Sequence, residues 1–141
     1  MSTTITTLAD AERAYGTEHY DYLDKAADIP VVSRIAAQGD VLIVRAEGVA
    51  PSTVPVPAAG FPVVAPVGQG HTHALFGPVF YTPSSTGSQD PSDLDLGVLT
   101  VPAGVQGLLS HPEHGGLLVE AGTYVVRRQR EQAHVVRFVE D

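Results

Sequence analysis

Four of the six histidines in the 141-residue chain stand in two closely spaced pairs. The first pair is His71 and His73, in the sequence GHTH, and the second is His111 and His114, in HPEH. On a β-strand, residues two positions apart point to the same side, so His71 and His73 can present their imidazoles to one point. Neutral imidazole is the commonest metal ligand among side chains. The two pairs therefore predict one shared metal site with these four histidines as ligands.

The sequence around the second pair places a carboxylate beside it. Residues 110–113, Ser-His-Pro-Glu, have the pattern of a helix start, with a capping serine and proline at the first helical position. A single helical turn would bring His111, Glu113 and His114 close together. Glu113 is the predicted catalytic residue if the protein is an enzyme, either as a further ligand or as a base beside the metal.

The chain has no cysteine, so the metal must be held by His, Asp or Glu. Three or four nitrogen and oxygen ligands suit zinc, iron, manganese or nickel, and the sequence does not choose among them. Three histidines with one open position would let the metal acidify a water molecule or bind an oxygen-rich, small-molecule substrate. Hydrolase and oxygenase chemistry both stay open.

Two other functions are compatible with the same histidines. They could form a hydrogen-bonded network that fixes loops without metal, in a non-catalytic module of a homo-oligomer or of a phage- or plasmid-linked assembly. They could also act as acid and base in an RNA-processing enzyme, which the formal net charge of −8 disfavours because an acidic surface repels phosphates. His19 and His134 are not expected to be ligands, and no serine–histidine–acid motif is apparent.

Composition predicts one soluble domain without nucleic-acid or membrane partners. Hydrophobic residues make up 43% of the chain and charged residues 17%, which is enough apolar material for a core. No apolar run approaches the roughly 18–20 residues of a membrane span, and the N-terminus lacks the features of a signal peptide. The absence of cysteine fits a reducing compartment. A cytoplasmic location is expected.

The hydrophobic pattern predicts a mainly β fold, a small β-barrel or sandwich, with one N-terminal α-helix. Helical spacing over Leu8–Ala26, with Thr7 and Asp10 as an N-cap pair, predicts an amphipathic helix that packs Leu8, Tyr15, Tyr22 and Leu23 on the rest of the protein. The chain is thus divided into an N-terminal helical segment, 1–28, and a β domain, 29–141.

Short β-branched runs between turn residues predict the strands. They are Val31–Ile35, Val41–Arg45 after a Gly39–Asp40 turn, His73–Thr82, Val98–Val101, Leu117–Val119, Thr123–Arg130 and His134–Val139. The proline-rich stretch Ala50–Val67 is expected to be an extended edge, Pro83–Asp95 a mobile loop, and the last two strands a closing hairpin.

Two stretches resemble the cupin superfamily. Residues 99–107, LTVPAGVQG, are similar to its second motif, and residues 70–73, GHTH, to its first. The resemblance implies a small β-barrel with His71 and His73 as metal ligands. It supplies no further ligand, because Gly107 stands where the cupin histidine should be and no glutamate follows His73 at the cupin interval.

A longer series of motifs is similar to a family of small uncharacterised bacterial and phage proteins. The series runs from Gln38-Gly39-Asp40-Val41-Leu42 through GHTHAL and HPEHGG to AGTYVVRRQRE, over about a hundred residues. The resemblance implies that the order of these motifs is a property of a family, and it implies no activity.

Overall fold

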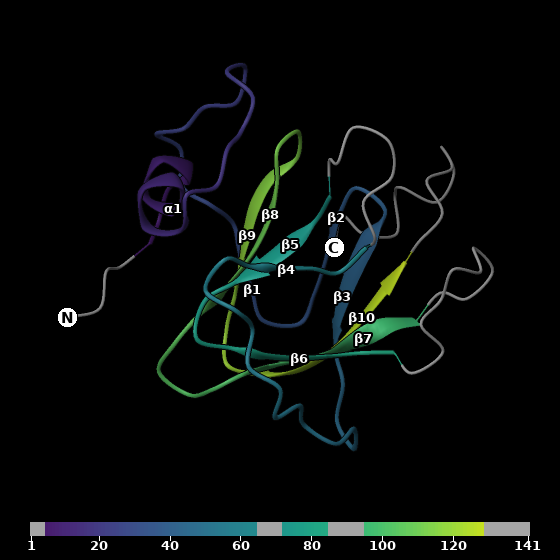
Figure 1. Ribbon diagram of the computed structural model, residues 1–141. Coiled ribbons are helices and arrows are strands. Elements are labelled where there is room, and N and C mark those ends of the chain that lie inside the picture. The colour runs from purple at the N-terminus through teal and green to yellow at the C-terminus, as the bar shows by residue number, and fades with distance from the viewer. Residues whose placement is uncertain (1–4, 65–71, 85–94, 129–141) are drawn as a thin grey trace.

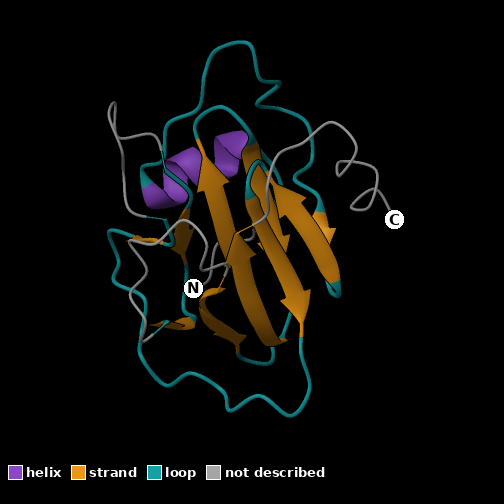
Figure 2. Cartoon of the chain, turned by 90° about the vertical axis from the view of Figure 1, so that its right-hand side faces the viewer, coloured by secondary structure: helices purple, strands orange, loops and turns teal. Residues whose placement is uncertain are grey.

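The structure is a computed structural model that describes residues 5–64, 72–84 and 95–128. Within those residues the strands form two five-stranded sheets, in the orders β1-β9-β8-β5-β4 and β2-β3-β10-β7-β6 (Figure 1). The two sheets form a sandwich, as the strand pattern predicted, and the helix α1 lies outside the first sheet (Figure 2).

The helix and strands have the following bounds: α1 Leu8–Tyr15, β1 Val31–Val32, β2 Ile35–Gln38, β3 Val41–Arg45, β4 Phe61–Pro62, β5 Ala74–Phe76, β6 Phe80–Pro83, β7 Asp95–Val101, β8 Gly107–His111, β9 Gly115–Val119 and β10 Gly122–Arg128. The predicted strand His73–Thr82 is in fact two strands in different sheets, because Gly77 and Pro78 interrupt it. Val31–Ile35 likewise divides between β1 and β2. The strand and hairpin predicted at the C-terminus lie outside the described residues, as does most of Pro83–Asp95.

The predicted helix is correct at its start and wrong at its end. Thr7 and Asp10 form a capping box, in which each side chain accepts from the backbone N–H of the other residue. The helix stops at Tyr15 because Gly16 adopts a left-handed conformation, with φ 72°, and donates to the carbonyl of Glu12. Gly16 thus terminates the helix within the range Leu8–Ala26 that was predicted to be helical.

The helical turn predicted at 110–113 is a β-hairpin instead. Strand β8 continues through His111, which pairs with Gly115, so that Pro112, Glu113 and His114 connect β8 to β9. Gly115 has φ 87°, the left-handed conformation that closes a three-residue hairpin loop. Pro112 with a glycine three residues later, at Gly115, suits this turn as well as a helix start, and the pairing of β8 with β9 decides between the two structures.

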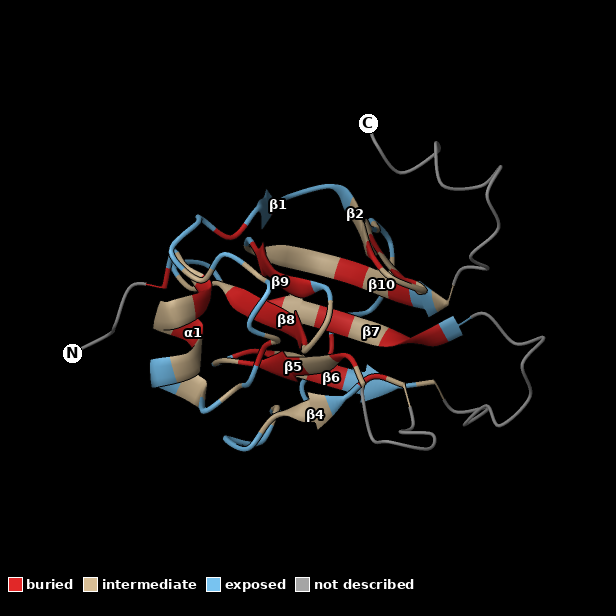
Figure 3. Ribbon diagram, turned by 90° about the horizontal axis from the view of Figure 1, so that it is seen from above, coloured by how far each residue is buried: buried red, intermediate tan, exposed pale blue. Residues whose placement is uncertain are grey.

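The core has two parts, one on each face of the first sheet. The larger lies between the sheets and includes Ile43, Leu75, Leu99 and Tyr124. The smaller lies between the first sheet and the N-terminal segment, and contains Ile5, Leu8, Ala11, Ile29, Phe76, Leu108 and Leu118. Figure 3 shows the consequence for β8 and β9, which are buried along their whole length.

The N-terminal segment packs on the sheet largely as predicted. Leu8 and Ala11 are buried, Tyr15 stacks on Phe76 and Leu23 is partly buried. Tyr22 is the exception: it is 70% exposed, because the helix has ended seven residues before it. No helix in the described part of the chain is long and apolar enough to cross a membrane.

Candidate functional site

Two hairpins and the start of a strand meet at one end of the sandwich. The β2–β3 hairpin of the second sheet carries Gln38 and Asp40 at its turn. The β8–β9 hairpin of the first sheet carries His111 and His114. His73 directly precedes β5, which pairs with β8 so that Ala74 faces Ser110. This register sets His73 beside His111, and the site joins the two sheets.

The structure brings together three of the four predicted ligands. The ring centroid of His73 lies 4.4 Å from that of His111 and 5.9 Å from that of His114, and the His111 and His114 centroids are 4.6 Å apart. His73 and His111 are buried, whereas His114 is exposed. The convergence of the two motifs therefore follows the prediction for these three histidines. His71 lies outside the described residues.

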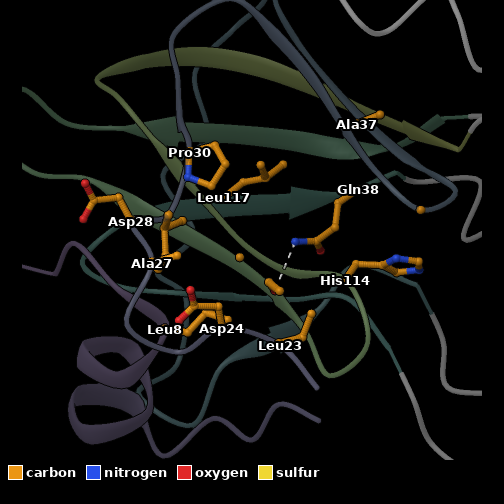
Figure 4. Close-up of a pocket in the computed structure, with 14 residues that line it drawn as sticks. Leu8, Leu23, Asp24, Ala27, Asp28, Pro30, Ala37, Gln38, His114 and Leu117 are labelled. Carbon is orange, nitrogen blue, oxygen red and sulfur yellow. Dashed lines mark hydrogen bonds between the residues drawn. The ribbon is translucent and has the colours of Figure 1, made fainter. Parts of the chain in front are cut away.

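Gln38 fixes the orientation of His73, a role that no local sequence pattern predicts. Its buried side-chain amide donates to the carbonyl of Leu109 at 3.1 Å. It also donates to the carbonyl of Gly115 at 3.3 Å, the bond drawn as a dashed line in Figure 4. The amide oxygen must then be the group that faces Nδ1 of His73, at 2.8 Å. An amide oxygen can only accept a hydrogen bond, so Nδ1 of His73 carries the proton. Nε2 of the neutral ring then has a free lone pair.

The lone pair of His73 faces a carboxylate. Nε2 lies 3.1 Å from Oδ1 of Asp40, which is half exposed. Burial lowers the pKa of His73, and Asp40 only partly offsets this effect. At neutral pH two electron-pair donors therefore point at each other, an arrangement that a cation between them would stabilise. Asp40 was absent from the predicted ligands because its role depends on the meeting of two hairpins.

His111 has the opposite tautomer. Its Nδ1 accepts a hydrogen bond from the backbone N–H of Glu113 at 3.0 Å, so Nε2 carries the proton when the ring is neutral. Nε2 of His111 is thus a donor in this arrangement. Metal ligation by His111, which the sequence predicted, would require it to give up the bond to Glu113.

The rings of His73 and His114 are stacked, whereas the ring of His111 is tilted by 41° to each of them. The planes of His73 and His114 differ by 6°, and among the described residues no three His, Asp or Glu side chains are grouped as ligands of one metal ion. Within the part of this cluster that the structure describes, Nε2 of His73 and Oδ1 of Asp40 face each other as a pair. His114 is exposed, so a change of rotamer could bring it to the same ion.

Glu113, the predicted catalytic residue, contacts the N-terminal segment. Its carbonyl accepts from the hydroxyl of Tyr22 at 3.2 Å, and its charge contributes, after burial, to raising the pKa of Tyr20. The backbone contact with Tyr22 and the effect on Tyr20 place Glu113 near residues 20–22. Its predicted role as a base beside a metal stays a prediction.

A second polar arrangement lies on the outer face of the first sheet. Nε2 of His19 lies 2.8 Å from Oγ of Ser110, and its Nδ1 lies 3.1 Å from Oε2 of Glu12. Lys25 contacts the same carboxylate oxygen at 3.0 Å. The side chain of His19 is fully buried, which leaves Ser110 without access for a substrate. The expectation that the chain has no serine–histidine–acid arrangement is therefore wrong, because Ser110 is 91 residues from His19 and only the fold brings them together.

Comparison with known proteins identifies a family and no activity. A model of a family described as a domain of unknown function, DUF8820, matches residues 37–129, which include Gln38, Asp40, His73, His111 and His114. No curated protein and no solved structure matches the chain. Because the model covers well over half of the sequence, the protein belongs to the DUF8820 family.

Proposed function

We propose that the protein binds a divalent metal ion through Nε2 of His73, the carboxylate of Asp40 and the ring of His114. The observation that carries the proposal is the position of Gln38, which leaves the Nε2 lone pair of His73 facing Asp40 at 3.1 Å. A hydrogen-bond acceptor on the distal nitrogen is the usual support of a ligating histidine, because it fixes both tautomer and orientation.

The donor set narrows the choice of metal. Two imidazoles and one carboxylate are the protein ligands of many catalytic zinc sites and of non-haem iron(II) sites, and both leave coordination positions open. When bound, such a metal would acidify water or polarise an oxygen of a substrate. The residues of the chain supply the rest: Gln38 holds His73 in place, and Nε2–H of the neutral His111 is a proton donor within the same cluster.

The test uses protein purified without a histidine tag and treated with EDTA. We expect calorimetric titration with zinc to give near-unit stoichiometry, and cobalt(II) to give a visible absorption band. Asp40→Asn and His114→Gln should each weaken binding by more than about tenfold. Both residues are exposed enough for the variants to fold, and Asp21→Asn, an exposed carboxylate of the N-terminal segment, is the matched control.

The rival function is that of a non-catalytic module in which the cluster only joins the hairpins. The two carbonyls bound by Gln38, on β8 and after the hairpin loop, favour such a role. In that case the Asp40 and His114 variants would bind zinc and cobalt(II) no differently from the control variant Asp21→Asn. A homo-oligomeric assembly and a cytoplasmic location remain proposals beside either function, and cupin-like catalysis on a small molecule remains a proposal beside the metal-binding function alone.

A further inference from the structure

A cavity of about 410 Å³ lies beside the histidine cluster, between the N-terminal segment and the two hairpins. Its walls are formed by Leu8 and residues 23–24 and 27–30 on one side and by residues 37–39 and 114–117 on the other. Figure 4 shows Asp24 and Asp28 on one side of the cavity and Gln38 and His114 on the other. The volume lies within the range of about 300–1,000 Å³ that is usual for small-molecule sites.

The lining of the cavity combines apolar side chains with negatively charged carboxylates. Leu8, Leu23, Ile29 and Leu117 are aliphatic, and among the described residues of the lining the ionised side chains are the carboxylates of Asp24 and Asp28. The nearby Lys25 does not balance them, since its ammonium group pairs with Glu12 at 3.0 Å. Charge complementarity therefore favours a ligand with an apolar body and a cationic group.

The cavity reaches the proposed metal site through Gly39 and His114. A Cβ atom at Gly39 would lie 2.8 Å from Nε2 of His114 and 3.2 Å from Cε1 of His73. Because Gly39 and His114 both line the cavity, a molecule seated there would extend from the carboxylates toward the rings.

We propose that this cavity binds a small molecule with an apolar body and a primary or secondary ammonium group, with the ammonium at Asp24 and Asp28. That this molecule is the substrate of the metal site rests on the proposed function. Its binding to the cavity does not, because none of the apolar or acidic contacts involves the metal.

The experiment measures binding of three probes of the same length to the EDTA-treated protein: 4-phenylbutylamine, 4-phenylbutan-1-ol and 4-phenylbutyrate. We expect the amine to bind more tightly than the alcohol and the acid to bind worst. The double variant Asp24→Asn/Asp28→Asn should bind the amine about fivefold more weakly than the parent protein and bind the alcohol with unchanged affinity. Added salt should reduce the preference for the amine, because both carboxylates are exposed.

A matched pair of variants tests whether the probe occupies this cavity. Ala26 and Ala27 are both exposed, and only Ala27 lines the cavity. Ala27→Phe should weaken the binding of the amine and of the alcohol to the same extent, whereas Ala26→Phe should weaken the binding of neither. Equal binding of the three probes, no detectable binding of the amine, or an identical effect of the two phenylalanines would overturn the proposal. Zinc binding, measured separately on the same protein, reports on the metal site alone.

Discussion

Gly39 is the residue on which the geometry of the cluster depends most directly. It has φ 59°, in the left-handed region that favours glycine, and a Cβ atom added to it would lie 2.8 Å from Nε2 of His114 and 3.2 Å from Cε1 of His73. We predict that Gly39→Ala destabilises the protein by about 1–2 kcal/mol in urea denaturation, from backbone strain and the displacement of His114. It should also shift the imidazole resonances of His114 and weaken binding of zinc.

Gly48 provides the control for that prediction. It has φ 81° but nothing within 4 Å of an added Cβ atom, so Gly48→Ala incurs the backbone strain alone. Its stability should fall by about 1 kcal/mol, while the histidine resonances and zinc binding stay as in the parent protein. Equal effects of the two substitutions on the histidines would show that Gly39 has no special part in the site.

The buried tyrosines Tyr81 and Tyr124 give a second prediction at this scale. The hydroxyl of Tyr124 donates to the carbonyl of Glu120 at 2.8 Å, whereas that of Tyr81 has no hydrogen-bond partner among the described residues and lies against Gly97. Tyr81→Phe should therefore leave thermal stability unchanged or raise it. Tyr124→Phe should lower stability by about 1 kcal/mol, because it leaves a backbone acceptor unpaired. A loss at Tyr81 as large as that at Tyr124 would contradict this account.

Among the elements, the N-terminal segment is fixed to β8 by the contact between the buried residues His19 and Ser110, with Glu12 as the second, partly exposed partner of His19. We predict a coupling free energy of about 1 kcal/mol or more between His19→Ala and Ser110→Ala in a double-mutant cycle measured by urea denaturation. Each single variant leaves a buried partner unpaired, so the double variant should lose less stability than the sum of the two.

Ser52 offers a comparison for the same cycle. It is as buried as His19 and hydrogen-bonds to Thr82, on β6 of the second sheet, with 2.7 Å between the two hydroxyl oxygens. Ser52→Ala and His19→Ala should act additively, because they share no partner. Coupling of the same size in both cycles would indicate a general loosening of the fold rather than a specific contact between His19 and Ser110.

The sequence predicts an element correctly where the residues that determine it lie within or next to that element. Val41–Arg45 and its preceding turn are predicted residue for residue, because strand alternation and turn chemistry both lie in the immediate sequence. The predictions for the end of α1 and for the β8–β9 hairpin are wrong. Gly16 and Pro112 are each compatible with more than one local structure, and packing selects among these structures. The roles of Gln38 and Asp40 depend on contacts between hairpins far apart in the chain, which no local pattern encodes.

At the scale of the whole molecule, His73 links folding stability to pH. Burial lowers its pKa in the folded state relative to the unfolded value of about 6.5. The unfolded chain therefore takes up the proton first as pH falls. We predict that the EDTA-treated protein loses stability below about pH 6.5, with a slope of at most about 1.4 kcal/mol per pH unit from this group.

The variant Asp40→Asn tests whether His73 is the group responsible for this pH dependence. Asp40 opposes the lowering of the His73 pKa, so its removal should make the loss of stability on acidification larger. The measurement is the urea midpoint between pH 8 and pH 5, compared with that of Asp21→Asn. A variant with a shallower pH dependence than the parent would show that the carboxylate does not act on His73 in this way.

The contacts of Gln38 also bear on the order of events during folding. The β2–β3 and β8–β9 hairpins close locally, but the bond from Gln38 to Leu109 spans 71 residues and forms only when the two sheets meet. Interactions completed after the rate-limiting step act on unfolding rather than on folding. Gln38→Ala should therefore accelerate unfolding in stopped-flow experiments with little change in the refolding rate, and zinc should prolong the lifetime of the native protein in the same way.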